Sequence, residues 1–338
     1  MNMPNTLLEL SHFPVMLSEV VKICNPKPGD QFLDCTFGGG GYTKELLKFS
    51  QTEVIAIDRD ISTIKIAKKI KKDYSNRFSF FNEKFSNIER VLKKNQKVDA
   101  IIFDLGMSSF QLLDMTRGFS FKSKDKLDMK MGLGSISAEE IINDLDENIL
   151  ILIIKILGEE KEAKKIVKNI IKARSIKRIS LVSELVKIIE KSKKKNYAKK
   201  INVCTKTFQA LRIFANKETS ELIEGITKAT KFLKVGGKII VISFHSIEDK
   251  IVKFYFNNYS ENKSKPSRYL PEEVDNENIF FESYRNKPMS PSKVEIEKNP
   301  PSRSAKLRFA LRNKNIFKEP NELKNKFKKY LQLEGING

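Results

Sequence analysis

Two hydrophobic patterns alternate along the first third of the chain. Short apolar runs are followed by segments in which apolar residues recur every three or four positions. The first pattern is typical of buried strands and the second of amphipathic helices, so their alternation predicts βαβ units and a parallel sheet. The predicted strands are Gln31–Cys35, Glu53–Ile57, Arg77–Phe81 and Val98–Asp104, and the helices after the first two are Tyr42–Phe49 and Ser62–Lys72.

The strand pattern stops in the middle of the chain. Ser137-Ala138-Glu139-Glu140 fits a capping box that opens a helix. Further on, Ile166, Ile170 and Ile171 share one helical face, and lysines occupy the other positions. The chain is therefore expected to contain an all-helical subdomain inserted into a discontinuous sheet domain. The predicted ranges are 114–206 for the basic, helical insertion and 1–113 with 207–338 for the sheet domain.

The α/β pattern returns after the insertion. A long helix is predicted over residues 207–233, followed by a turn at Gly236-Gly237 and a buried strand over Lys238–Ser243. Residues 257–301 are polar, contain prolines and lack a clear period, which predicts a long loop. The last predicted strand is Ala305–Leu311.

The composition is that of a globular chain. Of the 338 residues, 40% are hydrophobic, which is enough to bury a sizeable core. No apolar run approaches the ~20 residues that cross a bilayer, and the longest, Ile149–Leu157, predicts a buried helix. Met1–Leu10 does not have the pattern of a secretory signal, and the 3 cysteines do not have the spacing of a zinc site or a disulfide framework. Together these features favour the cytoplasm.

The net charge of +21 predicts an anionic partner, because a field of that sign attracts phosphate backbones or anionic membranes. Compositional drift towards lysine is the alternative, since only 12 of the 63 basic residues are arginine. The placement of the charge favours a localised surface. Residues 161–206 hold 16 basic and 3 acidic residues, a local net charge of +13. We therefore expect a polyanion-binding face in the helical insertion.

A glycine-rich turn follows the first predicted strand. The segment Asp34–Tyr42 reads DCTFGGGGY, and consecutive glycines let a ligand lie directly against main-chain N–H groups. A turn that needs glycine only for its geometry is the alternative. A Walker loop would require a lysine where Tyr42 stands, and the dinucleotide fingerprint would require a glycine where Thr43 stands.

Asp58 ends the second predicted strand about 20 residues beyond the glycines. A carboxylate at this point can accept hydrogen bonds from both hydroxyl groups of a ribose, although an aspartate at a strand end can also simply cap the next helix. The missing third glycine, with Asp34 leading the turn, favours S-adenosyl-L-methionine over a dinucleotide. The fold class is thus predicted as a Rossmann-like methyltransferase sheet with a helical insertion.

Further polar residues follow the later strands, where ligands bind in open α/β sheets. Asp104 could accept hydrogen bonds from an amino group, and Gln111 could reach the cofactor. Ser243 and His245 are expected to face the same cleft, although a structural role for His245 is an equal alternative. Because the chain has only 2 histidines, a histidine-rich metal site is not expected. Arg303 could hold a phosphate group or cap its loop.

These segments, taken in order, resemble the bacterial 16S rRNA (cytosine-N4)-methyltransferases, the RsmH or MraW family. Each motif alone is modest, but nine in the same order form a specific match that covers nearly the whole chain. The matching stretches are His12–Leu17, the glycine turn, Ala56–Asp60, Asp104–Ser109, Arg117–Phe121, Leu127–Met131, Thr207–Ile213, Ser243–Asp249 and Asn299–Ser304.

The resemblance implies S-adenosyl-L-methionine as cofactor and one cytidine in the decoding region of 16S rRNA, within the small ribosomal subunit, as substrate. The cofactor contacts that it implies are Gly40, Gly41, Tyr42, Asp58, Phe85, Asp104 and Gln111. The substrate candidates, from the segments above, are Ser108, Ser243, His245 and Arg303. Two positions depart from the family pattern, because Tyr42 stands where the family usually has histidine and Lys130 where it usually has arginine.

The implied reaction transfers a methyl group to the exocyclic N4 of the cytosine. Asp104 is the candidate catalytic residue, because an acceptor for the N–H bonds would aim the nitrogen lone pair. Neither Cys35 nor Cys204 is well placed for the thiolate attack that C5 methylation needs. The alternatives are a methyltransferase for a small molecule or a protein, and a non-catalytic RNA-binding assembly factor. No metal or membrane is expected, and the oligomeric state stays open.

Overall fold

A computed structural model describes residues 14–133, 136–193, 202–261 and 279–336. The chain forms two compact units, each of which is described by itself. The sheet unit comprises residues 1–108 and 224–323, and the helical unit comprises residues 109–223 and 324–338. The first residues of the motif that begins at His12 lie outside the described parts.

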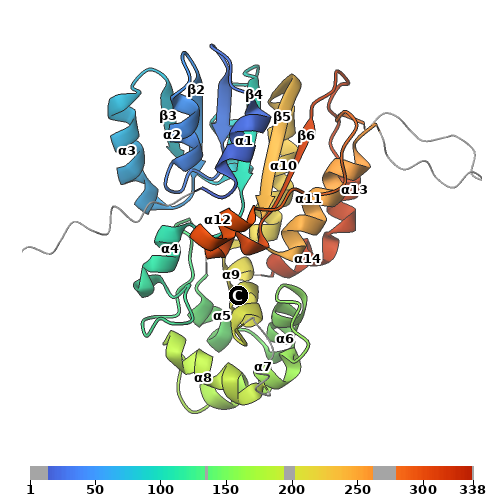
Figure 1. Cartoon of the computed structure of the whole chain (residues 1–338). Helices are drawn as coiled ribbons and strands as arrows, with labels where there is room; N and C mark the ends of the chain where they lie inside the picture. The colour runs from blue at the N-terminus through green and yellow to red at the C-terminus, as the bar shows by residue number, and fades with distance from the viewer. Residues whose placement is uncertain (1–13, 134–135, 194–201, 262–278, 337–338) are drawn as a thin grey trace, which may run out of the picture. The chain divides into compact units, whose positions relative to one another are not determined.

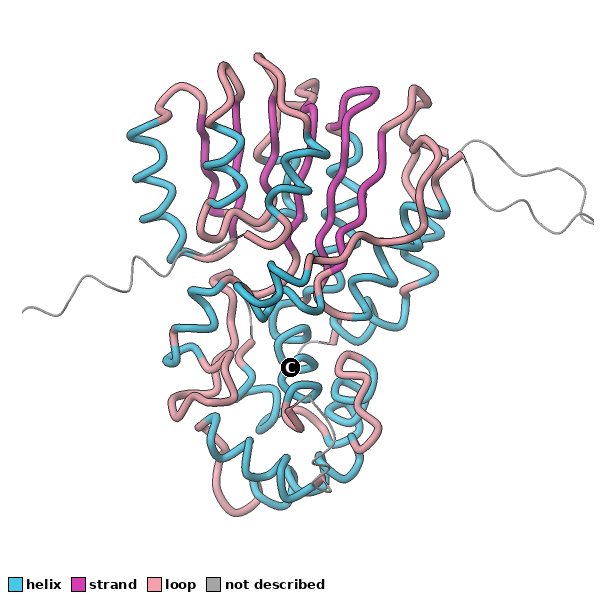
Figure 2. Tube along the Cα trace, viewed as in Figure 1, coloured by secondary structure: helices cyan, strands magenta, loops and turns pink. Residues whose placement is uncertain are grey.

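The sheet unit is built on six strands in the order β3-β2-β1-β4-β5-β6, drawn in magenta in Figure 2. The first five strands pair in parallel and the last one pairs antiparallel to its neighbour. The arrangement confirms the predicted α/β class with a Rossmann-like sheet (Figure 1). The strands are β1 Gln31–Asp34, β2 Glu53–Asp58, β3 Phe78–Asn82, β4 Val98–Asp104, β5 Leu233–Ser243 and β6 Lys306–Leu311.

The central strands are apolar over several consecutive residues because helices cover both of their faces. Residues 100–103 of β4 and 239–242 of β5 are all buried. Around the sheet lie the helices and short 3₁₀ turns of the same unit. They are α1 Leu17–Cys24, α2 Gly41–Leu47, η2 Ile61–Thr63, α3 Ile64–Asp73, η3 Phe85–Arg90, α11 Ser246–Asn258, α12 Lys293–Lys298 and η6 Pro300–Ser304.

The predicted helix over residues 207–233 is wrong in one respect, because it is two helices. The first is α9 Thr205–Asn216 and the second is α10 Glu218–Lys231. Between them Lys217 has a left-handed backbone with φ 51°. The Asn216 side chain lies at this break, donating to the Met129 carbonyl oxygen at 2.8 Å and accepting from the Met131 amide at 2.7 Å. This contact with a distant loop lies at the point where the helix ends.

Two further predictions need correction near the end of the sheet unit. The fifth strand begins at Leu233, and the predicted turn at Gly236-Gly237 is an irregularity within it, with Leu233 opposite Val98 and Lys238 opposite Ala100. The predicted loop over residues 257–301 contains a helix, α12, which Ser292 caps by accepting a hydrogen bond from the Glu295 amide at 3.1 Å. Residues 262–278 of that segment lie outside the described parts.

The helical unit confirms the predicted helical and basic character of the middle of the chain. The Ser137 capping box is present, and α7 is amphipathic, with Ile166 and Ile170 buried. Because α9 packs against α5 and α6, this compact unit extends beyond the predicted insertion. That residues 114–206 form the substrate-binding part of the chain stays a prediction. The elements of the helical unit are α4 Ser109–Leu113, η4 Met115–Arg117, α5 Ala138–Asp144, α6 Glu147–Ile156, α7 Ala163–Arg174, α8 Val182–Ser192, α9 and α14 Lys328–Glu334. One more helix, α13 Asn321–Lys326, begins in the sheet unit and ends in the helical unit.

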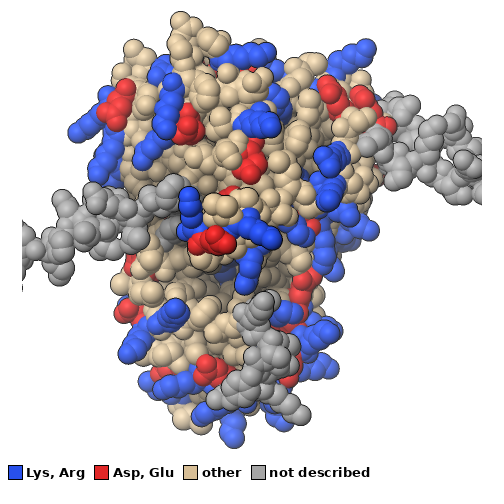
Figure 3. Space-filling view, in the orientation of Figure 1, with Lys and Arg blue, Asp and Glu red and all other residues tan. Residues whose placement is uncertain are grey.

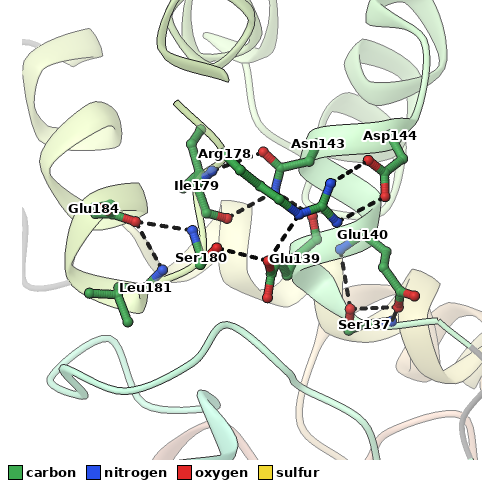
Figure 4. A network of polar contacts seen from close by, with 10 residues as sticks. All are labelled: Ser137, Glu139, Glu140, Asn143, Asp144, Arg178, Ile179, Ser180, Leu181 and Glu184. Atoms are coloured by element: carbon green, nitrogen blue, oxygen red, sulfur yellow. Dashed lines mark hydrogen bonds and ion pairs between the residues drawn. The ribbon is translucent and has the colours of Figure 1, made fainter. Parts of the chain in front are cut away.

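A polar network fixes the loop between α7 and α8 to α5 (Figure 4). Arg178 forms two hydrogen bonds with the Asp144 carboxylate, at 2.7 and 3.1 Å, and a third with Glu139 at 3.1 Å. Glu184 accepts hydrogen bonds from the amides of Ser180 and Leu181, both at 3.0 Å. The positive charge of Arg178 is therefore balanced within the unit. Across the described ranges, no helix is long and apolar enough to span a membrane.

Candidate active site

Three neighbouring strands of the sheet unit end in an aspartate at the same edge. Asp34 ends β1, Asp58 ends β2 and Asp104 ends β4, and the strands lie in the order β2-β1-β4. Burial raises the pKa of Asp34 and Asp58 to about 6 and that of Asp104 to about 7. The edge therefore holds three acids that ionise with difficulty as long as no cation lies near them.

Asp34 has a structural function within this edge. Its carboxylate accepts a hydrogen bond from the Thr43 hydroxyl at 2.7 Å and one from the Thr36 amide at 3.2 Å. Because Thr36 and Thr43 lie on either side of the glycines, Asp34 holds both ends of the glycine turn together. The side chain is fully buried.

Asp58 connects β2 to the same glycine turn. One carboxylate oxygen accepts from the Gly38 amide at 2.7 Å, and the other accepts from the Asp60 amide at 2.8 Å. Each carboxylate oxygen has two lone pairs, so the side chain keeps acceptor sites for further donors. This geometry fits the predicted contact with the hydroxyl groups of a ribose, which stays a prediction.

Packing inside the protein explains two of the glycines. Gly40 has φ +72°, and a Cβ atom there would lie 2.7 Å from Ile70 Cδ1 and 2.9 Å from the Phe37 ring. A Cβ atom on Gly41 would lie 2.7 Å from Pro14 Cγ. Both positions therefore need glycine for reasons within the protein, as the structural alternative predicts. This need does not depend on whether their main-chain N–H groups bind a ligand.

The Tyr42 side chain is engaged by the protein itself. It is 3% exposed, and its hydroxyl donates a hydrogen bond to the Val15 carbonyl oxygen at 2.5 Å. Burial, together with the nearby Asp104 and Asp34, raises the pKa of Tyr42 well above its ordinary value. The hydroxyl therefore stays protonated and acts as a donor to the main chain.

Asp104 differs from the other two acids in its partners. Its amide donates to the Thr36 hydroxyl at 2.7 Å, but its Oδ1 atom is buried and no hydrogen bond from the described residues reaches it. Desolvation is the main cause of its raised pKa, and the negative charges of Asp34, Glu248 and Glu295 add to it. Such a carboxyl group is suited to a ligand that brings N–H donors or positive charge.

Phe85 begins η3, just beyond the end of β3. Its ring packs edge-on against Phe103 with a centroid distance of 5.3 Å, and it contacts the backbone of α10 at Gly225. The Asn82 side chain donates to the Asp58 carbonyl oxygen at 2.8 Å, which fastens the start of this segment beside the ribose candidate. Residue-by-residue reasoning missed Phe85; the resemblance alone supplied it, and the only local signal is an aromatic residue just after a strand.

The remaining candidates differ in their surroundings. The Ser243 hydroxyl donates to the Lys306 carbonyl oxygen at 3.3 Å, and His245 caps α11, with Nε2 3.0 Å from Glu248 Oε1. These contacts favour structural roles for both. Arg303 is exposed in η6, and Ser108 is the last residue of this part of the sheet unit, whereas Gln111 belongs to the helical unit. Their roles in binding stay predictions.

Comparison with known proteins decides the family. The model of the MraW methylase family matches residues 9–313. The chain belongs to the MraW methylase family. It is accordingly a methyltransferase. Curated relatives named ribosomal RNA small subunit methyltransferase H are similar over nearly their whole length. That of Rickettsia akari is 42% identical, covering 89% of this chain and 98% of the relative, and that of Rickettsia typhi is 43% identical, covering 88% and 97%.

The two residues that depart from the family pattern have different surroundings. Tyr42 directs its hydroxyl to the Val15 carbonyl oxygen, as described above. At Lys130 the main chain is held, because Arg117 donates to the Lys130 carbonyl oxygen at 2.8 Å. The Lys130 ammonium group lies 3.5 Å from the Asp128 carboxylate, and both side chains are more than a third exposed, so the charge contributes little to stability.

The cysteines of this MraW family member do not have the properties of nucleophiles. All three lie in described parts of the chain, where they are buried and free. Burial raises the pKa of Cys24 and Cys204 to about 12 and that of Cys35 well above its ordinary value. The thiol groups therefore stay protonated, whereas attack on a base requires a thiolate.

Proposed function

We propose that the chain transfers a methyl group from S-adenosyl-L-methionine to the exocyclic N4 of a cytidine in the decoding region of 16S rRNA. The observation that carries this proposal is the buried Oδ1 atom of Asp104, which no hydrogen bond from the described residues reaches. It lies at the sheet edge that also carries the glycine turn and Asp58. The names of the curated relatives support ribosomal RNA of the small subunit as the substrate.

The residues at this edge fit the methyl donor. Asp58 keeps lone pairs for ribose hydroxyl groups, Phe85 offers part of an aromatic ring for an adenine, and the acids at this edge favour a positively charged ligand. When bound, S-adenosyl-L-methionine supplies an electrophilic methyl group on a positively charged sulfur. Gln111 and the main chain at residues 40–42 complete the proposed cofactor contacts.

Asp104 is the proposed catalytic residue. The N4 amine of cytosine is a poor nucleophile because its lone pair is delocalised into the ring. The Asp104 carboxylate would accept a hydrogen bond from one N–H group of this amine and so aim its lone pair. The same carboxylate would accept the proton that leaves the nitrogen. Its pKa of about 7 suits this exchange near neutral pH. Further acceleration would come from holding the two reactants in a fixed geometry.

The helical unit is the proposed RNA-binding part. A cytosine must leave its stack to reach a buried carboxyl group, and the surrounding RNA must be held while it does so. Exposed lysines on α7 provide sequence-independent contacts for phosphate groups. Because the proposed substrate belongs to the ribosome, we also propose the cytoplasm as the place of action.

The test uses methyl-labelled cofactor and small ribosomal subunits that lack the modification. We expect label on N4 of a single cytidine, and no label on subunits that already carry the modification. Label on C5, on a small molecule or on protein would contradict the N4 assignment. A chain that binds RNA but shows no heat of binding with S-adenosyl-L-methionine would instead be a non-catalytic assembly factor.

A further inference from the structure

The glycine turn is held from outside by a segment that lies far from it in the sequence. Pro14, Val15 and Met16, which we call the clasp, precede α1. The Pro14 ring lies against Gly41 so closely that no side chain fits between them, as the 2.7 Å distance to a Cβ atom on Gly41 shows. Val15 and Met16 are buried. The clasp therefore covers one side of the main chain that is proposed to contact the methyl donor.

Two side chains hold the clasp by its main chain. The Tyr42 hydroxyl donates to the Val15 carbonyl oxygen at 2.5 Å, and Glu295 Oε1 accepts from the Met16 amide at 2.7 Å. Tyr42 lies in the first turn of α2, directly after the glycines, whereas Glu295 belongs to α12, near the other end of the chain. Adjacent residues of the clasp are thus fastened to two different elements, one by its acceptor and the other by its donor.

The backbone of Met16 shows that the clasp needs such support. Met16 has φ 54°, in the left-handed region that residues with a side chain rarely adopt. A conformation of this kind persists only where neighbouring groups hold it. The hydrogen bond from Met16 to Glu295 is one such restraint, and it comes from outside the local segment.

The clasp also lies close to the proposed catalytic acid. The Tyr42 side chain lies within hydrogen-bonding reach of the Asp104 carboxyl group, and the negative charge of Glu295 acts on that group through space. The same two side chains therefore connect the glycine turn, the clasp and the neighbourhood of Asp104. The contact between Glu295 and Met16 involves no atom that the proposed transfer reaction uses, whereas Tyr42 also contacts the proposed catalytic acid.

We propose that Tyr42 and Glu295 are positioning residues for the methyl donor, which hold Val15 and Met16 so that Pro14 stays closed over Gly41. The proposal rests on the proposed function, since it concerns the same cofactor turn. The proposal gives α12 and Tyr42 a role in retaining the cofactor. Tyr42 stands where the family usually has histidine. In this role Tyr42 acts through the clasp.

Calorimetric titration with S-adenosyl-L-methionine tests the proposal. Tyr42→Phe removes the donor to Val15 together with the contact to Asp104, and Glu295→Ala removes the acceptor for the Met16 amide. We expect each to weaken binding about three- to ten-fold, the effect of losing one hydrogen bond. Glu295→Gln keeps an oxygen that can accept from Met16 and should bind like the wild type. Matched controls are Glu297→Ala, on the exposed side of the same helix, and Tyr74→Phe, at the end of α3.

Two measurements separate positioning from general stability. Hydrogen exchange of the peptide that contains Met16 should accelerate in Glu295→Ala but not in Glu297→Ala. Turnover at saturating donor should stay within about two-fold of the wild type in Glu295→Ala, while the KM for the donor rises. The double variant should lose less affinity than the two single losses combined, because both side chains act on one segment.

The outcomes distinguish this proposal from the one on which it rests. If the wild-type chain did not bind the donor at all, the proposed function would fail and the clasp proposal with it. If the wild type binds and both variants keep its affinity, the clasp proposal alone is overturned, even if their melting temperatures fall. Should Tyr42→Phe not fold, Glu295→Ala on the half-exposed α12 decides the question.

Discussion

Asp104 combines two properties that an ordinary surface aspartate does not have. One carboxylate oxygen is buried without a hydrogen bond from the described residues, and burial raises the pKa of the side chain to about 7. Asp34 and Asp58 also have raised pKa values, but each accepts hydrogen bonds from the glycine turn. At the scale of single residues, the site therefore separates two acids that hold the turn from one whose Oδ1 atom receives no hydrogen bond from the described residues.

The first prediction concerns Asp104→Asn. We expect turnover to fall by about 10²–10⁴-fold, the usual contribution of a positioned acid–base group. The melting temperature of the cofactor-free protein should rise at neutral pH, because an amide does not ionise in a site that penalises charge. Methyl transfer and thermal unfolding measure the two effects, with Asp73→Asn, at the exposed end of α3, as the control. Full turnover in Asp104→Asn would remove the role proposed for this carboxyl group.

The ends of β1, β2 and β4 act together at the scale of elements. Their three acids have pKa values raised from 3.8 to between about 6 and about 7. Between the unfolded and the folded pKa values, the folded protein binds more protons than the unfolded chain. The contribution of the three acids to stability therefore falls as the pH rises through this range. A cation bound at this edge would offset the loss, because it favours the ionised carboxylates.

A pH dependence of cofactor binding follows from this arrangement. The increase in melting temperature that S-adenosyl-L-methionine causes should be larger at about pH 8 than at about pH 5.5. S-adenosylhomocysteine lacks the methyl group and its positive charge on sulfur, so its effect should change less with pH. Thermal unfolding with each ligand, at several pH values, measures the difference. Equal pH dependence for both ligands would show that the acids do not respond to the sulfonium charge.

At the scale of the whole molecule, positive charge is spread widely. Lys and Arg side chains occur across the face shown in Figure 3. Within the helical unit some of this charge is internal, since Arg178 is paired with Asp144 and Glu139 (Figure 4). The lysines of α7 at positions 164, 165, 168 and 172 are exposed. They are the described residues of this unit that best fit a contact with phosphate groups.

The α7 lysines provide the third prediction. Replacing Lys164, Lys165, Lys168 and Lys172 together by Gln should weaken binding to small-subunit RNA. It should also make the dependence of log K on log salt shallower, by about 0.7–0.9 for each lost phosphate contact. The control replaces the four exposed lysines of α3, at positions 65, 68, 69 and 72, by Gln. This change removes the same charge from the sheet unit. An equal loss in both variants would point to net charge instead of a local surface.

The sequence determined the features that depend on neighbours along the chain. Val98–Asp104 was predicted with its final bounds, and the Ser137 capping box is present, because a strand period and a helix cap are encoded within a few residues. The spacing of Asp58 from the glycines likewise predicts a ribose-binding site, which stays a prediction. The family resemblance could be recognised in the same way, since each of its motifs is a short continuous stretch.

Only the tertiary structure decided the features that depend on distant contacts. The helix break at Lys217 lies where Asn216 binds the loop at residues 129–131, which no periodicity reveals. The clasp joins Met16 to a glutamate 279 positions away. The burial that raises the pKa of Asp104 likewise arises from the packing of several elements around one carboxyl group. A local pattern specifies which element forms, but the partners of a side chain are set by where the folded chain brings it.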